Sequence, residues 1–228
     1  QLAARHWIEC QHAGADRPCS GEQDEQEQHE GFKRSADVWQ AAERGQQVAV
    51  NDRFGQAKEG VSDTRGVYGD FYHVEYHADI DRTKPWAMWR GFGNSYGYNR
   101  NEHEDNILTT AQTVQMVVDV VSNNGNIEFN LGPKADGTLA AFEVERLEAM
   151  GRWLGVNGES IYGASKSPFG AQDFGRTTWN PERRRLFAHV YRWPESGLVT
   201  LKGARMKPTA ATLLARPGDP VAVRATDE

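Results

Sequence analysis

Residues 109–133, TTAQTVQMVVDVVSNNGNIEFNLGP, contain the change of hydrophobic period that decides the fold class. Thr109 and Gln112 have the spacing of a capping box at the start of a helix. Apolar residues then recur on one helical stripe, at Ala111, Val114, Val118 and Val121. The run Asn123–Gly125 ends the helix, and NIEFN (126–130) follows as a strand. The stretch therefore predicts a helix that leads directly into a strand.

Neighbouring segments extend this alternation on the amino-terminal side. WAMWRGF (86–92) is an aromatic strand candidate, and DFYHVEYH (70–77) alternates with a period of two. Earlier still, ADVWQAAERG (36–45) predicts a short helix before the strand QVAVNDRF (47–54).

On the carboxyl-terminal side, the turn ADGT opens a helix over 140–158 whose apolar face holds Phe142, Leu147, Met150 and Leu154. Alternating strands and helices are typical of an α/β protein with a parallel sheet. After about residue 164 the period becomes two, which predicts a second, all-β domain. Its expected strands are TTW (177–179), RLFAHVYRW (185–193), GLVTLKG (197–203) and ATLLA (211–215).

Composition excludes several classes of protein. The net charge of -6, without clustered Lys or Arg, argues against a nucleic-acid partner. No apolar run approaches the length of a membrane span, and the first residues show no secretory signal. The spacing of Cys10 and Cys19 matches no zinc-binding pattern. A single disulfide between the two is an alternative. Seven Trp and seven Tyr suit a packed core or a sugar-binding surface.

The strand at 47–54 ends in three polar residues, Asn51, Asp52 and Arg53. Polar side chains at the carboxyl end of a buried strand indicate a functional site, because parallel strands open there onto a common rim. The alternative for Arg53 is a surface salt bridge.

Five segments together resemble the retaining α-L-fucosidases, glycoside hydrolase family twenty-nine, over about residues 38–200. They are VNDRFG, DFYHVEY, SYGYNRNE, VVDVVSNNGNIEFNLGPKADGTL and GRWLGVNGESIYG. The resemblance implies a (β/α)8-like barrel followed by a β-sandwich. A closed barrel needs about 250 residues, so this chain would supply only its second half. We expect an acidic, irregular segment over 1–35, the half barrel over 36–163 and a truncated antiparallel β-sandwich over 164–228.

The resemblance also implies roles for particular residues. Glu75 matches the acid/base glutamate in a DF-x-x-x-EY pattern, and we expect Tyr72 and Tyr76 to bury it, which would favour its protonated form. Arg53 would reach the sugar or the nucleophilic carboxylate. Tyr96 matches an aromatic residue that packs against the methyl side of fucose, with anchoring of its own loop as the alternative.

Neighbouring polar residues carry weaker predictions. His73 and His77 flank Glu75, so a metal site is an alternative there, although the resemblance implies no metal or cofactor. The acidic loop NEHED (101–105) is most simply interpreted as a solvent-exposed rim of the site.

Departures from the family pattern bear on activity. The family nucleophile is an Asp in a Trp-x-Asp segment about thirty residues before Arg53, where this chain has SGEQDEQEQHEG and only Asp24 at that distance. Trp86 is followed by Ala87, where the family usually has Glu after the Trp. Glu128 replaces an aliphatic residue in a strand, where burial of its charge would be costly.

These patterns predict the carboxyl-terminal part of an exo-α-L-fucosidase that lacks its nucleophile and is inactive alone. Its partner would be a fucosylated oligosaccharide or glycoconjugate, with no nucleic acid or membrane. The sequence itself does not indicate a compartment, and the resemblance to the family implies a secreted, periplasmic or lysosome-like one. One alternative is a non-catalytic homologue or carbohydrate-binding module. Another is an unrelated α/β protein whose β-sandwich makes protein contacts.

Overall fold

The computed structural model describes residues 44–45, 49, 70–76, 85–204 and 208–224. The chain divides into two compact units, Gln1–His73 and Val74–Glu228. The helix predicted over 36–45 and the strand predicted over 47–54 therefore lie almost wholly outside the described residues.

A three-stranded sheet with the order β1-β2-β3 carries the α/β part of the chain. Its strands are β1 (Tyr72–Glu75), β2 (Trp86–Gly91) and β3 (Gly125–Asn130). β2 and β3 are parallel, with Trp86 opposite Gly125 and Gly91 opposite Asn130. Parallel strands need a crossover, which here contains the short helix η2 (Glu104–Asn106) and the helix α4 (Thr110–Ser122). The α/β prediction is confirmed for this part of the chain.

The helix α4 begins as the sequence predicts. The backbone N–H of Gln112 donates to the Thr109 hydroxyl at 3.2 Å, and the Thr109 N–H donates to Oε1 of Gln112 at 2.8 Å. The predicted apolar stripe is only partly right, because Ala111 is exposed while Thr113, Val117 and Val120 are buried. The reason is that α4 contacts three elements, β3, the helix α5 and the strand β4, so that its buried surface is wider than one stripe.

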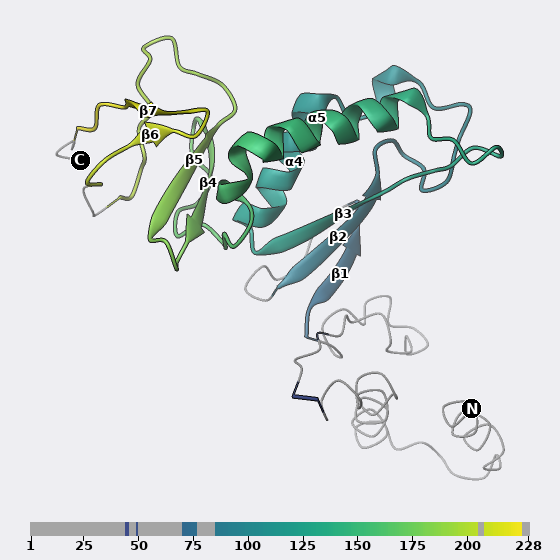
Figure 1. The fold of residues 1–228 in the computed structure, drawn as a ribbon, viewed down its shortest axis with the longest axis horizontal. Coiled ribbons are helices and arrows are strands. Elements are labelled where there is room, and N and C mark those ends of the chain that lie inside the picture. The colour runs from purple at the N-terminus through teal and green to yellow at the C-terminus, as the bar shows by residue number, and fades with distance from the viewer. Residues whose placement is uncertain (1–43, 46–48, 50–69, 77–84, 205–207, 225–228) are drawn as a thin grey trace. The chain divides into compact units, whose positions relative to one another are not determined.

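The helix α5 (Ala141–Asn157) follows β3 and continues into η3 (Gly158–Ser160). The predicted face of Phe142, Leu147, Met150 and Leu154 is only half-buried. The buried residue of α5 is Glu143, whose carboxylate accepts hydrogen bonds from the N–H groups of Gly132 at 2.9 Å and Ala140 at 3.2 Å. Figure 1 shows α4 and α5 on one face of the sheet.

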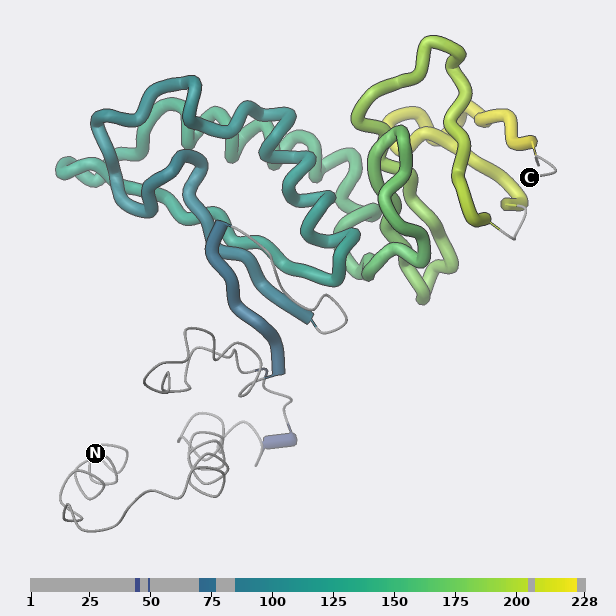
Figure 2. The backbone as a smooth tube through the Cα atoms, turned by 180° about the vertical axis from the view of Figure 1, so that it is seen from behind, coloured from purple at the N-terminus to yellow at the C-terminus, as the bar shows by residue number. Residues whose placement is uncertain are grey.

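Two small antiparallel sheets follow, labelled β4 to β7 in Figure 1, and this part of the chain is the green-to-yellow end of the tube in Figure 2. One pairs β4 (Gly175–Asn180) with β5 (Arg185–Val190), and the other pairs β6 (Thr212–Leu213) with β7 (Arg216–Pro220). The strand predicted over 197–203 is not formed. Instead, the N–H of Lys202 donates to the side-chain oxygen of Gln172 at 2.9 Å. The sequence RPGDP of β7 was not predicted as a strand, because proline removes a ladder donor.

Asp119 connects α4 to the β4–β5 pair. Its carboxylate lies 2.8 Å from the guanidinium of Arg176 and accepts a hydrogen bond from the Tyr191 hydroxyl at 3.0 Å. Burial, followed by the charge of Asp119, raises the pKa of Tyr191 above its ordinary value, so the hydroxyl remains a donor. Within the described ranges, no helix combines the length and the apolar character needed to cross a membrane.

Replacement of Glu143 by Ala should lower the free energy of unfolding by about 2 kcal/mol, because two backbone N–H groups lose a charged acceptor. Urea denaturation followed by circular dichroism measures the change. Glu145→Ala is the matched control on the exposed side of the same helix turn. Equal stabilities of the two variants would contradict a role for Glu143 in joining α5 to the loop before it.

His189 gives a second prediction, on pH. Its Nε2 lies 3.0 Å from the Thr178 hydroxyl, which itself donates to the Ser160 carbonyl at 2.7 Å, so Nε2–H is the donor to Thr178. Burial lowers the pKa of His189 from 6.5 to about 4. The unfolded chain therefore takes up a proton before the folded chain does. The unfolding free energy should fall as the pH drops from about 6.5 to about 4, by at most about 3 kcal/mol.

The measurement is urea denaturation at a series of pH values across that window. The expected His189 contribution is complete above pH 6.5 and lost towards pH 4. The unfolding free energy of His189→Gln should depend less steeply on pH over this interval. A pH dependence equal to that of the wild type would show that His189 titrates normally in the folded state.

Candidate active site

The carboxyl ends of β1 and β2 meet at Tyr76, the residue directly after β1. Its backbone N–H donates to the Trp89 carbonyl at 3.2 Å, and its hydroxyl accepts from the Gly91 N–H at 3.3 Å. Because the end of β1 contacts the end of β2, the two strands run in the same direction. Tyr76 has a φ of +56°, a left-handed conformation that strains a bulky side chain, and residues with such strain cluster at functional sites.

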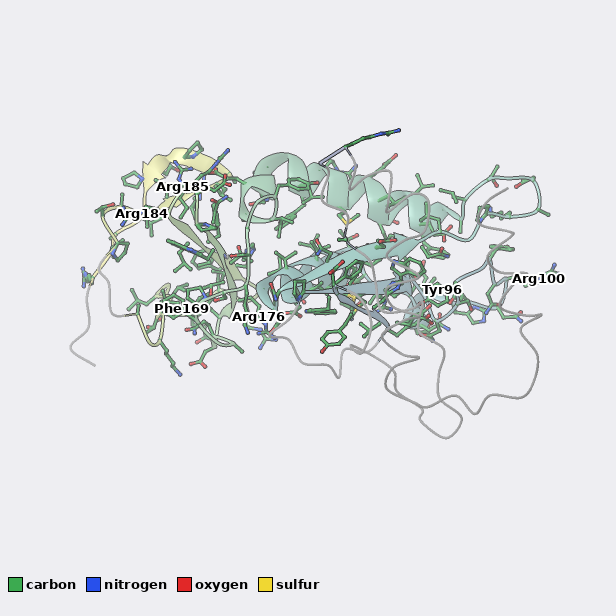
Figure 3. The ribbon with its side chains drawn as sticks, turned by 90° about the horizontal axis from the view of Figure 1, so that it is seen from below. Tyr96, Arg100, Phe169, Arg176, Arg184 and Arg185 are labelled. Carbon is green, nitrogen blue, oxygen red and sulfur yellow. The ribbon has the colours of Figure 1, made fainter. Side chains whose placement is uncertain are left out.

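Tyr96 packs on Tyr76 at this edge of the sheet. The two rings meet edge to face, with centroids 5.2 Å apart and an interplanar angle of 68°. The Tyr96 hydroxyl donates to the same Trp89 carbonyl at 2.9 Å. Arg90 covers the Tyr76 ring, with its guanidinium carbon 5.2 Å from the ring centroid, and burial lowers the pKa of Arg90. In Figure 3, Tyr96 lies beside the strands, with Arg100 farther out.

Glu102 closes the loop that carries Tyr96. One oxygen of its carboxylate accepts from the N–H groups of Asn94 at 2.5 Å and Ser95 at 2.9 Å. The carboxylate lies directly over Gly93, where a Cβ atom would come within 2.2 Å of it. Glycine is therefore required at 93 for Glu102 to reach both backbone donors.

The loop after β3 supports the Tyr96 loop from the other side. The side-chain amide of Asn130 donates to the Tyr96 carbonyl. At Gly132 a Cβ atom would lie 2.4 Å from the backbone nitrogen of Tyr98, so the two loops touch through their main chains. A small cleft between them is lined by Tyr98, Glu102 and Glu143, among other residues.

The two faces of the sheet have different surroundings. The Trp86 indole N–H donates to the carbonyl of Asn123, at the end of α4, at 2.8 Å, and the Arg90 guanidinium contacts the sulfur of Met116 in α4 at 3.3 Å. Because side chains alternate along a strand, Ala87 and Trp89 point to the opposite face. Glu128, opposite Trp89 in the ladder, is exposed, so its charge carries no cost of burial.

The structure places two of the three site residues predicted from the sequence. Glu75 is the last residue of β1, and Tyr96 lies on the loop after β2, where its hydroxyl bonds to the Trp89 carbonyl. Both residues are therefore at the same edge of the sheet. Glu75 is exposed, and the predicted burial by Tyr72 and Tyr76 is not observed. Arg53 lies outside the described residues, as does Asp24.

The predicted metal alternative involves His77, which also lies outside the described residues. Among the residues that are described, no group of three or more His, Cys, Asp or Glu side chains is arranged to hold a metal ion.

Sequence reasoning missed Glu102 and Asn130. The run NEHED was interpreted as a solvated rim, yet its Glu102 is half-buried and bonded to two backbone N–H groups. A signal was present, because the loop GFGNSYGYN before it exposes many backbone donors and needs nearby acceptors.

Comparison with known proteins gives one consistent family. The family model described as Alpha-L-fucosidase matches residues 9–159. The tissue α-L-fucosidases of Rattus norvegicus and Homo sapiens are each 32% identical, over 180 and 185 residues. Each match covers 76% of this chain and 37% of the relative. The chain thus spans little more than a third of the length of these relatives.

Solved structures agree. The α-L-fucosidase isoenzyme 1 of Paenibacillus thiaminolyticus matches with a TM-score of 0.62 and 25% identity, covering 89% of this chain and 55% of that enzyme. An α-L-fucosidase of Bacteroides thetaiotaomicron, trapped as a covalent intermediate, matches with a TM-score of 0.68. At 23% identity, over 79% of this chain and 44% of that one, the second match shows the fold alone.

Replacement of Glu102 by Ala should speed hydrogen exchange at the backbone N–H groups of Asn94 and Ser95 by roughly 10- to 100-fold, the loss expected for a charged acceptor. Exchange measured by NMR reads both positions directly. Glu104→Ala changes an exposed carboxylate two residues away and should leave both rates unchanged. Equal rates in wild type and Glu102→Ala would contradict the assignment of Glu102 as the acceptor that closes the loop.

Proposed function

The chain belongs to the α-L-fucosidase family, and we propose that it is the carboxyl-terminal part of a retaining exo-α-L-fucosidase. The whole enzyme would hydrolyse terminal α-L-fucosyl linkages in a fucosylated oligosaccharide or glycoconjugate. The observation that supports this most is the family match over residues 9–159, which includes the edge of the sheet where Glu75 and Tyr96 lie together.

The proposed architecture is the second half of a (β/α)8-like barrel over 36–163, followed by a β-sandwich over 164–228. Parallel β2 and β3 joined through α4, with α5 after β3, support the barrel half. The antiparallel pairs β4–β5 and β6–β7 support the second part.

Glu75 is the proposed acid/base residue. In the first step, a carboxylate from elsewhere in the enzyme attacks the anomeric carbon while Glu75 donates a proton to the departing glycosidic oxygen. In the second step, Glu75 accepts a proton from water, and the water oxygen attacks the anomeric carbon and releases fucose. The position of Glu75 at the carboxyl end of β1 suits this role, because catalytic groups of parallel barrels come from the strand ends.

Tyr96 and Arg53 are the proposed substrate contacts. The Tyr96 ring is held by Tyr76 and by the Trp89 carbonyl, so it can offer a fixed apolar surface to the methyl side of fucose. Arg53 would use its fork of donors to bind the sugar hydroxyls or the nucleophilic carboxylate.

We further propose that the chain alone does not hydrolyse fucosides, because the Trp-x-Asp segment of the family is absent and Asp24 matches by distance only. One observation favours a second candidate, a non-catalytic homologue. Ala87 stands where the family usually has glutamate, and its side chain is only 7% exposed within β2.

A small anion should replace the missing nucleophile. With 4-nitrophenyl α-L-fucoside and sodium azide, azide nitrogen bonds to the anomeric carbon as the bond to the aryl oxygen breaks, and the aryl oxide takes the Glu75 proton. The product is β-L-fucosyl azide, detected by NMR, with nitrophenol measured by absorbance. Without azide, we expect no release of nitrophenol.

With phenyl α-L-fucoside, whose more basic leaving oxygen needs the proton, Glu75→Gln should slow the azide reaction at least about 100-fold, the contribution typical of acid catalysis. The nitrophenyl substrate should be slowed less, because its aryl oxide can leave without a proton. Glu148→Gln, an exposed carboxylate on α5, is the control and should not change the rate. Rapid hydrolysis without azide would show that a nucleophile is present. Fucose binding by calorimetry without any azide product would support the non-catalytic homologue, and neither binding nor product would refute the proposed function for this chain.

A further inference from the structure

The hydrogen-bond register places Glu75, Trp89 and Glu128 in a single row across three strands. In a parallel ladder, a residue bonds to the two residues that flank its partner. Trp89 accepts from the N–H of Tyr76, so its partner in β1 is Glu75. In β3 its partner is Glu128.

Residues in one row of a pleated sheet point to the same face. Arg90 and Trp86 contact α4, so Trp89 and its two partners point away from the helices. All three side chains of the row are exposed, Trp89 by 39%. The sheet therefore presents an indole flanked by two carboxylates, on the face opposite α4.

This row has the chemistry of a sugar-binding surface. The apolar C–H face of a pyranose packs well on an indole ring. Carboxylates are strong acceptors for the hydroxyl groups at the edge of such a ring. Nothing in the sequence pattern alone joins Glu128 to Glu75, because 53 positions separate them and the connection depends on the register of both ladders.

The spacing indicates which role Glu128 can have. Neighbouring strands lie about 4.8 Å apart, so the Cα atoms of Glu75 and Glu128 are separated by roughly 10 Å. A nucleophile in a retaining glycosidase needs its carboxyl about 5 to 5.5 Å from the acid/base carboxyl. With the Trp89 indole between them, the two carboxylates are placed to bind opposite edges of one ring rather than to act as that pair.

We propose that Trp89 and Glu128 form, with Glu75, a binding site for one pyranose ring, in which Trp89 stacks on the sugar and Glu128 accepts its hydroxyl hydrogens. The inference rests on the proposed function for the role of Glu75. Trp89 and Glu128 are then substrate-binding residues, and Glu128 sets which hydroxyl arrangement is accepted.

Titration of the full chain with L-fucose, followed by tryptophan fluorescence and by calorimetry, tests the site. Fucose should change the fluorescence of the wild type, and Trp89→Phe should remove most of that change. Glu128→Gln should raise the calorimetric Kd about 10-fold, because a neutral amide is a weaker acceptor. Glu182→Gln, an exposed carboxylate in the β4–β5 turn, is the matched control and should bind as the wild type does.

The outcomes separate this inference from the proposed function. An unchanged Kd in Glu128→Gln, with weaker binding in Glu75→Gln, would overturn the role of Glu128 and leave the fucosidase proposal intact. Binding of D-glucose but not L-fucose, with the same dependence on Trp89 and Glu128, would support a pyranose site in this row and contradict fucose as its ligand. Absence of binding for both sugars would overturn the inference, while the azide reaction decides the fucosidase proposal independently.

Discussion

The parallel pairing of β2 with β3 is the constraint from which the arrangement of the candidate site follows. Two parallel strands cannot be joined by a hairpin, so the chain must cross one face of the sheet, and α4 does so. This crossing commits Trp86 and Arg90 to contacts with α4 and leaves Trp89 and Glu128 on the opposite face. It also brings the carboxyl ends of the strands, with their polar and aromatic residues, to one edge.

Carboxylates, rather than a continued ladder, organise the loops beyond that edge. Glu102 accepts from two N–H groups of the loop after β2, and Glu143 accepts from two N–H groups around the loop after β3. Each carboxylate satisfies backbone donors that lie outside the strand ladders. Asn130 and the close contact at Gly132 then join the two loops, which fixes the position of Tyr96.

The sequence predicted the elements whose signals are local. The capping box at Thr109 and the strand NIEFN are both observed, because spacing and alternation act within a few residues. The expected burial of Glu75 is not observed, because exposure depends on what covers a face of the sheet. Glu102 was missed because its partners are fixed by the path of the loop. The row of Glu75, Trp89 and Glu128 could not be predicted, because it depends on the register of β1 against β2 and of β2 against β3. Only the hydrogen bonds between these strands define the two registers.

The register of β1 against β2 is therefore the quantity that tests the account most directly. NMR scalar coupling across hydrogen bonds identifies which carbonyl carbon accepts from the Tyr76 N–H. Coupling to the carbonyl of Trp89 is expected, because that hydrogen bond places Glu75 in the same row as Trp89 and Glu128. Coupling to the carbonyl of Met88 or Arg90 would mean that the register differs by one residue, so that Glu75 points to the opposite face from Trp89. That result would contradict the shared site.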